Sequence, residues 1–367
     1  MLKPLPDYPW DQMVPFAERA RAHPDGIVDL SIGSPVDPTP EVIRQALADA
    51  TDAHAYPQTA GTPQLQRAII EWYARRRGVL GLTEANVLPT IGSKELVALL
   101  PFMLGLGEGD TVVHPVAAYP TYAIGAAMAG ADAVAADNPA DWPATTKLVW
   151  LNSPGNPDGH VLTVAELRQA VDRARSLGAV IVSDECYAEL GWAGDWLTDP
   201  IPSILDPRVI GTDRRDVLAI YSLSKQSNMA GYRGAFAAGC ATVLGRLLTV
   251  RKHAGLMLPA PLQAAMVAAL GDDAHVAEQK ERYRARRELL LPALEAAGFR
   301  IQRSEAGLYL WASEGRDAWE SIGRLADLGI LAGPGPFYGA GSAQQVRFSL
   351  TATDERIAAA TERLKGA

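Results

Sequence analysis

A lysine, an arginine and two serines lie close together in the stretch SLSKQSNMAGYRG, residues 222–234. The stretch follows an apolar run, 217–220, that is typical of a buried parallel strand. At the end of such a strand, the hydroxyls of Ser222 and Ser224 and the guanidinium of Arg233 can hold a phosphate dianion. The amine of Lys225 can form an imine with an aldehyde. We therefore interpret the stretch as a site for a phosphorylated aldehyde cofactor and not as an exposed loop with solvated charges.

Ser222 and Lys225 also fit the S-x-x-K pattern of serine acyl-hydrolases that use a lysine as their base. Those enzymes need companion S-D-N and K-T-G motifs, and neither string occurs in this sequence. The absence of both companions favours the cofactor site.

The phrase SLSKQSNMAGYR resembles the lysine segment of class I and II aminotransferases, the fold-type I enzymes that use pyridoxal 5′-phosphate (PLP). Within that family it is similar to the variant found in actinobacterial N-succinyldiaminopimelate aminotransferases. The resemblance implies that Lys225 carries PLP and moves a proton between the substrate and the cofactor. It also implies which residues anchor the cofactor phosphate: Gly92, Ser93, Lys94 (through its backbone), Ser222, Ser224 and Arg233.

A second apolar run, 179–182, ends in Ser183-Asp184-Glu185-Cys186-Tyr187. A carboxylate at the end of a buried strand is costly unless it is paired, and a protonated pyridine nitrogen would be its partner. The residues match the family's D-E-x-Y motif, which implies that Asp184 keeps the nitrogen protonated and that Tyr187 holds the phenolate oxygen. Glu185 and Cys186 are then expected to point elsewhere, with Cys186 as a packing residue.

Three further cofactor residues follow from motifs that occur in the family's order. SPGNPDG resembles N-P-x-N-P-T-G and implies that Asn156 also holds the phenolate oxygen. PVAAYPTY implies that Tyr119 stacks on the pyridine ring. YPQTAG implies that Tyr56 reaches the phosphate of a partner subunit. Taken singly, each of these residues also has a plainer interpretation as a loop or packing residue.

Two motifs imply contacts to the substrate. Gly33, in GSPVDPTP, resembles the family's substrate loop, although turn chemistry alone would favour a simple turn there. Arg347, in VRFS after the glycine-rich GPGPFYGAG, matches the arginine that clamps the substrate α-carboxylate. A single strand arginine could equally form a structural salt bridge, but the motif context favours the clamp. Asn156 is expected to approach the same carboxylate.

The elements that must position these residues alternate along the chain. Strand-like runs at 27–33, 86–91, 111–114, 147–152, 179–184 and 217–220 are separated by predicted helices at 41–50, 63–77, 92–104 and 164–177. Helices are also predicted at 239–253, 274–297 and 319–328, and Ser93 is a candidate N-cap. This order favours an α/β sheet with helices on both faces.

The family fold implies two domains. A large, mostly parallel seven-stranded sheet domain is expected at 33–275. A small α/β domain is expected to combine 1–32 with 276–367.

Composition excludes other classes of function. The chain has 367 residues and a net charge of −8, which argues against nonspecific binding to nucleic acid or an anionic membrane. Two cysteines cannot form a disulfide framework, which fits a cytoplasmic protein. The start of the sequence shows no signal core, and no bilayer-spanning run or metal-binding motif appears.

These observations predict a homodimeric PLP-dependent aminotransferase that uses N-succinyl-L,L-diaminopimelate and 2-oxoglutarate, in lysine biosynthesis. Its distal pocket should offer cationic or hydroxyl donors near 33–37, near 333–341 or from the neighbouring chain. The alternatives are an aminotransferase for aspartate or another amino acid, a PLP-dependent carbon–sulfur lyase, and a noncatalytic PLP-binding regulator. The regulator would normally carry a fused DNA-binding domain, for which the chain has no room.

Overall fold

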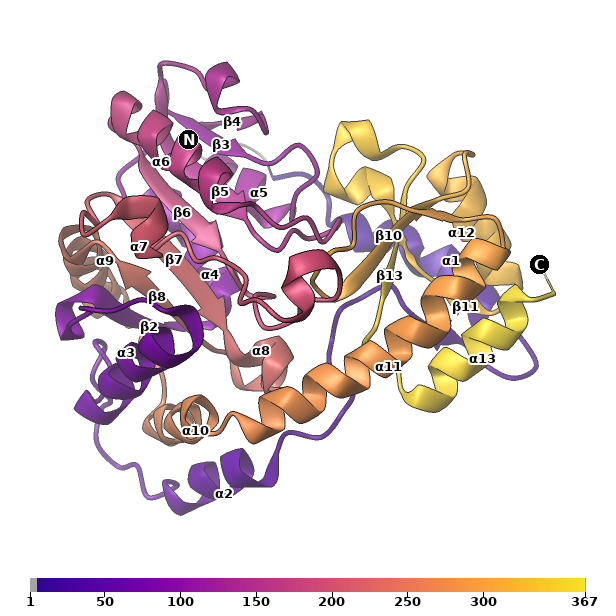
Figure 1. The fold of residues 1–367 in the computed structure, drawn as a ribbon, viewed down its shortest axis with the longest axis horizontal. Coiled ribbons are helices and arrows are strands. Elements are labelled where there is room, and N and C mark those ends of the chain that lie inside the picture. Colours follow the sequence, from indigo (N-terminus) through magenta and orange to yellow (C-terminus); the bar gives the residue numbers. More distant parts are fainter. Residues whose placement is uncertain (1–4, 367) are drawn as a thin grey trace.

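The computed structural model describes residues 5–366, and a seven-stranded sheet forms its larger part (Figure 1). In space the strands run β2-β8-β7-β6-β5-β3-β4, with β7 to β4 parallel and β8 antiparallel to both of its neighbours. The predicted large, mostly parallel seven-stranded sheet is therefore confirmed. Its strands are β2 (Val87–Ile91), β3 (Thr111–His114), β4 (Asp132–Ala135), β5 (Thr146–Asn152), β6 (Val180–Asp184), β7 (Val217–Ser222) and β8 (Gly234–Gly239).

Helices cover both faces of this sheet, and each layer buries an apolar stripe. One face packs against α3 (Pro63–Arg77), α6 (Val164–Leu177), α7 (Pro207–Ile210) and α10 (Ala260–Gly271). The other packs against α4 (Gly92–Met103), α5 (Thr121–Ala129) and α9 (Ala241–Ala254). The short helices α2 (Glu41–Asp49) and α8 (Leu223–Gln226) lie outside these layers, with α2 against α10. Two buried faces explain why the central strands are almost continuously apolar.

The sheet register places three polar strand ends next to one another. Asn152 at the end of β5 lies opposite Asp184 at the end of β6, and Asp184 lies opposite Ile220 near the end of β7. Because parallel strands end at the same edge of a sheet, residues that follow β5, β6 and β7 share one site.

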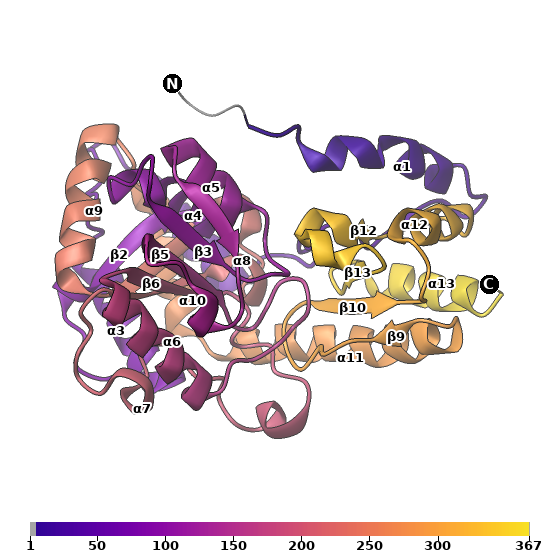
Figure 2. The same ribbon diagram turned by 90° about the horizontal axis from the view of Figure 1, so that it is seen from above.

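The N-terminus and the C-terminal third form a second, smaller unit (Figure 2). A four-stranded antiparallel sheet, in the order β12-β13-β10-β9, is accompanied by a parallel β1-β11 pair. The small strands are β1 (Val28–Asp29), β9 (Arg300–Ile301), β10 (Tyr309–Ser313), β11 (Ile330–Leu331), β12 (Gly333–Pro334) and β13 (Val346–Ser349). The helices are α1 (Val14–Arg21), α11 (Ala274–Ala296), α12 (Ala318–Asp327) and α13 (Asp354–Leu364), with a 3₁₀ turn, η1 (Pro9–Met13), before α1. The domain limits at 33 and 275 remain predictions.

Three details differ from the sequence-based expectations. A strand, β8, follows the lysine stretch directly, so the helix predicted from 239 begins only at Ala241. Strand β8 reads GAFAAG, and its small residues carry little strand propensity; its burial between β2 and β7 decides its structure. The strand predicted at 27–33 is limited to Val28–Asp29. Ser93 lies inside the first turn of α4 and is not its N-cap, which is Ile91.

Two general findings concern residues 5–366. None of the helices in this range is both long and apolar enough to cross a bilayer. The same range contains no group of three or more His, Cys, Asp or Glu side chains that could hold a metal ion.

Candidate functional site

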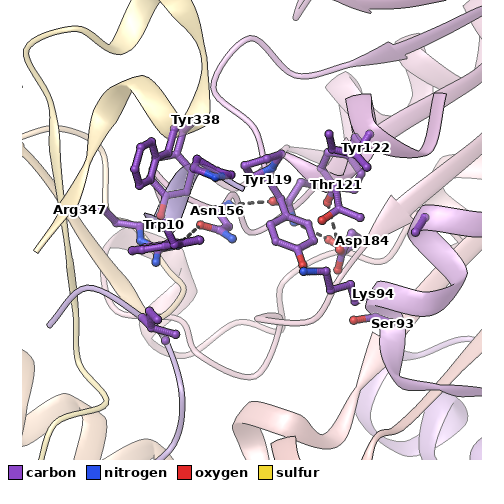
Figure 3. Close-up of a pocket in the computed structure, with 18 of the residues that line it drawn as sticks. Trp10, Ser93, Lys94, Tyr119, Thr121, Tyr122, Asn156, Asp184, Tyr338 and Arg347 are labelled. Atoms are coloured by element: carbon purple, nitrogen blue, oxygen red, sulfur yellow. Dashed lines mark hydrogen bonds between the residues drawn. The ribbon is translucent and has the colours of Figure 1, made fainter. Parts of the chain in front are cut away.

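A cavity of about 910 Å³ lies between the carboxyl edge of the large sheet and the small unit (Figure 3). Its lining includes most of the residues that the sequence motifs indicated. These are Gly33, Ser93, Lys94, Tyr119, Asn156, Asp184, Tyr187, Ser222, Ser224, Lys225, Arg233 and Arg347. Gly92 and Tyr56 are not among the lining residues, although Gly92 contacts Arg233.

Lys225 is placed by the turn from β7 into α8. Ser222 ends β7, and its hydroxyl accepts a hydrogen bond from the Ser224 amide at 3.2 Å and donates one to the Ser224 hydroxyl at 2.8 Å. The Lys225 ammonium donates to the Gly33 carbonyl oxygen. Burial lowers the pKa of Lys225, which increases the share of free amine available to attack an aldehyde.

One face of α11 holds the segment that follows Lys225. The His275 ring bonds to Ser227 at 2.8 Å, and Gln279 accepts a hydrogen bond from Asn228 at 2.8 Å. Tyr283 donates to the Lys225 carbonyl oxygen at 3.4 Å. Because α11 leads into the small unit (Figure 1), this polar face ties Lys225 to the unit that carries Arg347.

Arg233 lines the cavity, and Gly92 lies directly against it. The Gly92 backbone has φ +71°, and a Cβ there would lie 2.3 Å from a terminal guanidinium nitrogen of Arg233. The Gly92 amide donates to the Arg233 carbonyl oxygen at 2.7 Å. Only glycine leaves room for the guanidinium at the start of the twelve-residue helix α4, where helix amides and Ser93 favour an anion.

Asp184 is a buried carboxylate without a cation. Only 7% of its surface is exposed, and it accepts hydrogen bonds from Tyr122 at 3.0 Å and from the Cys186 amide at 3.2 Å. Among residues 5–366, no basic side chain forms an ion pair with it. Burial raises its pKa, against the lowering effect of bonds from Cys186 and Tyr122. A protonated pyridine nitrogen in the cavity would supply the missing positive charge, so these residues fit PLP.

Tyr122 was not indicated by the sequence, although it belongs to the same YPTY string as Tyr119. It is fully buried, stacks on Trp150 with ring centroids 5.1 Å apart, and directs its hydroxyl at Asp184. Tyr119 lines the cavity beside it, as Figure 3 shows. Tyr122 lies in the first turn of α5 and Tyr119 in the segment before that helix, and only the fold reveals that β6 lies beneath Tyr122.

Replacing Tyr122 by phenylalanine should remove one hydrogen bond to the Asp184 carboxylate and keep the ring packed on Trp150. Hydrogen bonds to charged groups contribute about 1.5–3 kcal/mol, so we expect roughly a 10-fold loss in the rate of amino transfer with little change in KM. The measurement is a single-turnover rate with the bound cofactor followed by absorbance. An unchanged rate would show that the hydroxyl does not support Asp184.

Cys186 corrects an expectation from the sequence. It was expected to point elsewhere, but it lines the cavity between Asp184 and Tyr187. Cys186 comes two residues after Asp184, and this spacing puts two side chains on the same side of an extended chain. Glu185 does point away, and binds Arg77 at 3.2 Å and the Ile204 amide at 2.7 Å.

Arg347 enters the cavity from β13 of the small sheet. Its guanidinium donates to the Asn156 side chain at 2.8 Å and to the Ser31 carbonyl oxygen at 2.7 Å. It also packs on the rings of Tyr309 and Tyr338, with its central carbon 3.9 and 4.7 Å from their centroids. The side chain has no carboxylate partner within residues 5–366, and its position is suited to an external carboxylate.

An aromatic wall of Trp10, Trp319 and Phe337 closes the outer part of the cavity. The Phe337 ring lies 5.3 Å from Trp10 and 5.6 Å from Trp319, both edge-to-face. These residues come from η1, α12 and the loop after β12, which are far apart in the sequence. No local motif signals such a wall.

Tyr56 stands apart from the rest. Its side chain is 97% exposed and belongs to the loop between α2 and α3. Its assignment to a partner's phosphate remains a prediction.

Comparison with known proteins supports the same family throughout the chain. The model of the family described as "Aminotransferase class I and II" matches residues 25–364. The chain is 54% identical over 365 residues to the 4-dedimethylamino-4-oxo-anhydrotetracycline transaminase OxyQ of Streptomyces rimosus, covering 99% of this chain and 100% of that protein. It is 54% identical over 361 residues to the probable aminotransferase Rv1178 of Mycobacterium tuberculosis, with 98% and 85% covered.

More distant relatives extend the comparison. The LL-diaminopimelate aminotransferase of Desulforudis audaxviator is 32% identical over 385 residues, with 100% of this chain and 96% of that protein covered. A solved structure of a Thermus thermophilus aspartate aminotransferase single mutant superposes with a TM-score of 0.87 at 25% identity, covering 99% and 97% of the two chains.

Proposed function

The chain belongs to the class I and II aminotransferases, which use PLP, and we propose that it transfers the amino group of N-succinyl-L,L-diaminopimelate to 2-oxoglutarate. When bound, PLP supplies an aldehyde that takes up the amino group and a ring that withdraws electrons from the α-carbon. In this proposal Lys225 holds the cofactor and carries the α-proton, and Asp184 balances the charge on the ring nitrogen. Tyr187 and Asn156 hold the phenolate oxygen.

Arg347 provides the α-carboxylate end of the substrate site. It faces the same cavity as Lys225 and carries no carboxylate partner in the described chain. Asn156 accepts from Arg347 at 2.8 Å, so a single amide side chain would link the substrate carboxylate to the cofactor oxygen. An amino acid bound by Arg347 would place its α-carbon towards Lys225, which orients the proton transfer.

Lys94 supports the proposal that the distal end of the amino donor is acidic. The basic side chains that line the cavity are those of Lys94, Lys225, Arg233 and Arg347. The Lys94 ammonium lies 6.0 Å from the Tyr119 ring centroid, and within residues 5–366 it pairs with no carboxylate. We propose that it binds the succinyl carboxylate of the donor. Of the cationic or hydroxyl donors expected near 33–37 and 333–341, these loops bring the Tyr338 hydroxyl to the cavity lining.

The aromatic wall favours a second candidate function. Trp10, Trp319 and Phe337 offer flat apolar surface, which suits a ketone or amine carried on a ring system. The name of the relative OxyQ describes amino transfer to an oxo-anhydrotetracycline. An aspartate or aromatic amino-acid aminotransferase and a carbon–sulfur lyase are further alternatives on the same scaffold.

A donor panel with 2-oxoglutarate as acceptor separates these candidates. The proposal predicts a kcat/KM for N-succinyl-L,L-diaminopimelate that is roughly 10-fold higher than for alanine, aspartate or aromatic amino acids, because Lys94 is exposed and its pairing with a carboxylate adds only about 1 kcal/mol. Lys94→Gln should raise the KM for this donor about 10-fold and leave alanine unchanged. Lys252→Gln, an exposed change on α9, is the matched control.

Each other outcome of the panel has a clear meaning. A preference for aspartate or an aromatic amino acid would end the succinyl proposal while leaving the family assignment intact. Preferred turnover of a ring ketone would establish the second candidate. Release of pyruvate and ammonia without a keto acid would establish a lyase.

We also propose that the working unit is a homodimer whose two sites each use Tyr56 of the other chain. Hybrids of inactive Lys225→Ala chains and weakened Tyr56→Phe chains would contain one site with both native residues. Mixing the two inactive or weakened proteins should therefore restore up to half of the native activity per hybrid dimer. Full activity in a sample shown to be monomeric by light scattering would contradict this arrangement.

A further inference from the structure

Tyr309, at the start of β10, lies where the carboxylate end and the cofactor end of the cavity meet. Its ring supports the Arg347 guanidinium at 3.9 Å, and its hydroxyl lies 3.2 Å from the Tyr187 hydroxyl. Both side chains line the cavity. Tyr309 therefore touches the residues proposed to bind the substrate carboxylate and the cofactor oxygen.

The place of the Tyr309 hydroxyl is built into the fold. A Cβ on Gly33 would lie 2.2 Å from this oxygen, so the hydroxyl occupies the space that a side chain at position 33 would fill. The Gly33 carbonyl oxygen in turn accepts a hydrogen bond from Lys225. The hydroxyl is thus enclosed by Gly33, Tyr187 and Arg347, close to the Lys225 amine.

The charges around Tyr309 and Tyr187 favour one direction for the hydrogen bond between their hydroxyls. Burial opposes ionisation of Tyr309, but Arg347 and Lys225 outweigh it and lower the Tyr309 pKa. Burial raises the pKa of Tyr187, and its bond with Tyr309 adds to this effect. From these charges we infer that Tyr187 donates to Tyr309 when neither hydroxyl has another partner.

We propose that Tyr309 is a positioning residue that couples carboxylate binding at Arg347 to the hydrogen bond that Tyr187 gives the cofactor oxygen. A carboxylate on Arg347 would neutralise the positive charge above the Tyr309 ring and make its oxygen a stronger acceptor. Tyr187 would then share its proton more with Tyr309 and less with the cofactor oxygen. The pKa of the Lys225 nitrogen, once bonded to the cofactor, would rise when a substrate carboxylate arrives. The inference rests on the roles proposed above for Arg347 and Tyr187.

The test is a pH titration of the absorbance of the cofactor bound to Lys225, with and without succinate as an unreactive carboxylate. Wild type should show a pKa that succinate raises. Tyr309→Phe keeps the ring under Arg347 and removes only the acceptor, so the pKa without succinate should fall by about half a unit or more. The shift caused by succinate should shrink to less than half of the wild-type shift.

A double-mutant cycle identifies the route of the coupling. On a Tyr187→Phe background, Tyr309→Phe should change neither the pKa nor the succinate shift further, because the hydrogen bond is already gone. Tyr309→Ala also removes the ring, and should in addition weaken succinate binding. The difference between the phenylalanine and alanine variants separates the contribution of the hydroxyl from the contribution of the ring.

Two results would overturn the proposal, and they are distinguishable. If Tyr309→Phe retains the wild-type pKa and succinate shift, Tyr309 is only a packing residue and the site assignment stands. If wild type itself shows no pH-dependent absorbance or no response to succinate, the roles of Lys225 and Arg347 fail, and the coupling fails with them.

Discussion

Replacing Lys225 by alanine should abolish covalent attachment of PLP and reduce the amino-transfer half-reaction by at least about 10⁴-fold, since both the nucleophile and the proton carrier are lost. Among residues 5–366, Lys94 is the remaining lysine of the cavity lining, and its ammonium lies 6.0 Å from the Tyr119 ring centroid. The fold should persist, since Lys225 lies in the short helix α8 with its side chain in the cavity lining and not in the apolar core. Circular dichroism checks the fold, and absorbance of the bound cofactor checks attachment.

Lys225→Arg is the conservative comparison. It preserves a positive charge near Gly33 but cannot form the bond, so it should be as inactive as the alanine variant. If either variant still transfers amino groups at more than about one per cent of the wild-type rate, a loss smaller than general acid–base catalysis typically supplies, Lys225 is not the reactive lysine.

Replacing Asp184 by asparagine should have the second-largest effect. The carboxylate is buried and bonded to Tyr122 and to the Cys186 amide, and asparagine preserves its shape. Without the negative charge, the ring nitrogen loses the partner that keeps it protonated, and we expect the half-reaction to slow by about 10³-fold or more. A near-native rate would reduce Asp184 to a structural role.

Glu185→Gln is the matched control one residue away. Glu185 is fully buried against Arg77, Ser203 and the Ile204 amide, and it does not line the cavity. Losing one partner of a buried pair costs about 3–5 kcal/mol of stability. This variant should therefore unfold at lower urea concentration, while its cofactor spectrum and its rate per bound cofactor stay close to wild type.

Asp184 also predicts opposite effects on stability with and without PLP. Burial raises its pKa in the folded apoprotein, so its contribution to stability is present below the ordinary aspartate pKa and is lost as pH rises through the folded pKa. At neutral pH, Asp184→Asn should therefore stabilise the apoprotein, by about 1.4 kcal/mol for each unit of pKa shift. The gain should disappear at pH 3 to 4. With PLP bound, the same variant should be less stable than wild type.

Urea unfolding of both forms measures this reversal. An apoprotein that is destabilised by Asp184→Asn at neutral pH would show that the carboxylate is already stabilised without the cofactor, in conflict with a site built to receive a cation.

The sequence was most informative where a motif lies at the end of one strand. Asp184 ends β6, whereas Asn156 and Lys225 follow β5 and β7, and the apolar runs predicted these three strands. The family resemblance then supplied roles that composition could not. Strand β8 was missed because GAFAAG has weak propensity and becomes a strand only between two partners.

Other parts of the site depend on contacts between distant segments. Tyr122 reaches Asp184 across 62 positions, and Tyr309 reaches Tyr187 across 122. The aromatic wall joins Trp10 to Phe337 and Trp319. The Tyr309–Tyr187 contact depends on how the small unit docks on the large sheet, and the Tyr122–Asp184 contact depends on how α5 packs over β6. No local pattern encodes these contacts. Cys186 was misplaced because the motif interpretation set aside its two-residue spacing from Asp184, which puts both side chains on one side of an extended chain.

The most direct test of the account is borohydride reduction of the PLP-loaded protein, followed by tryptic digestion and mass spectrometry. Reduction fixes the cofactor on whichever amine it is bonded to and blocks cleavage there. The account predicts one modified peptide, 216–233, with an uncut Lys225 between Arg215 and Arg233. A cofactor mass on a peptide that contains Lys94 or any other lysine, with Lys225 cleaved normally, would contradict it.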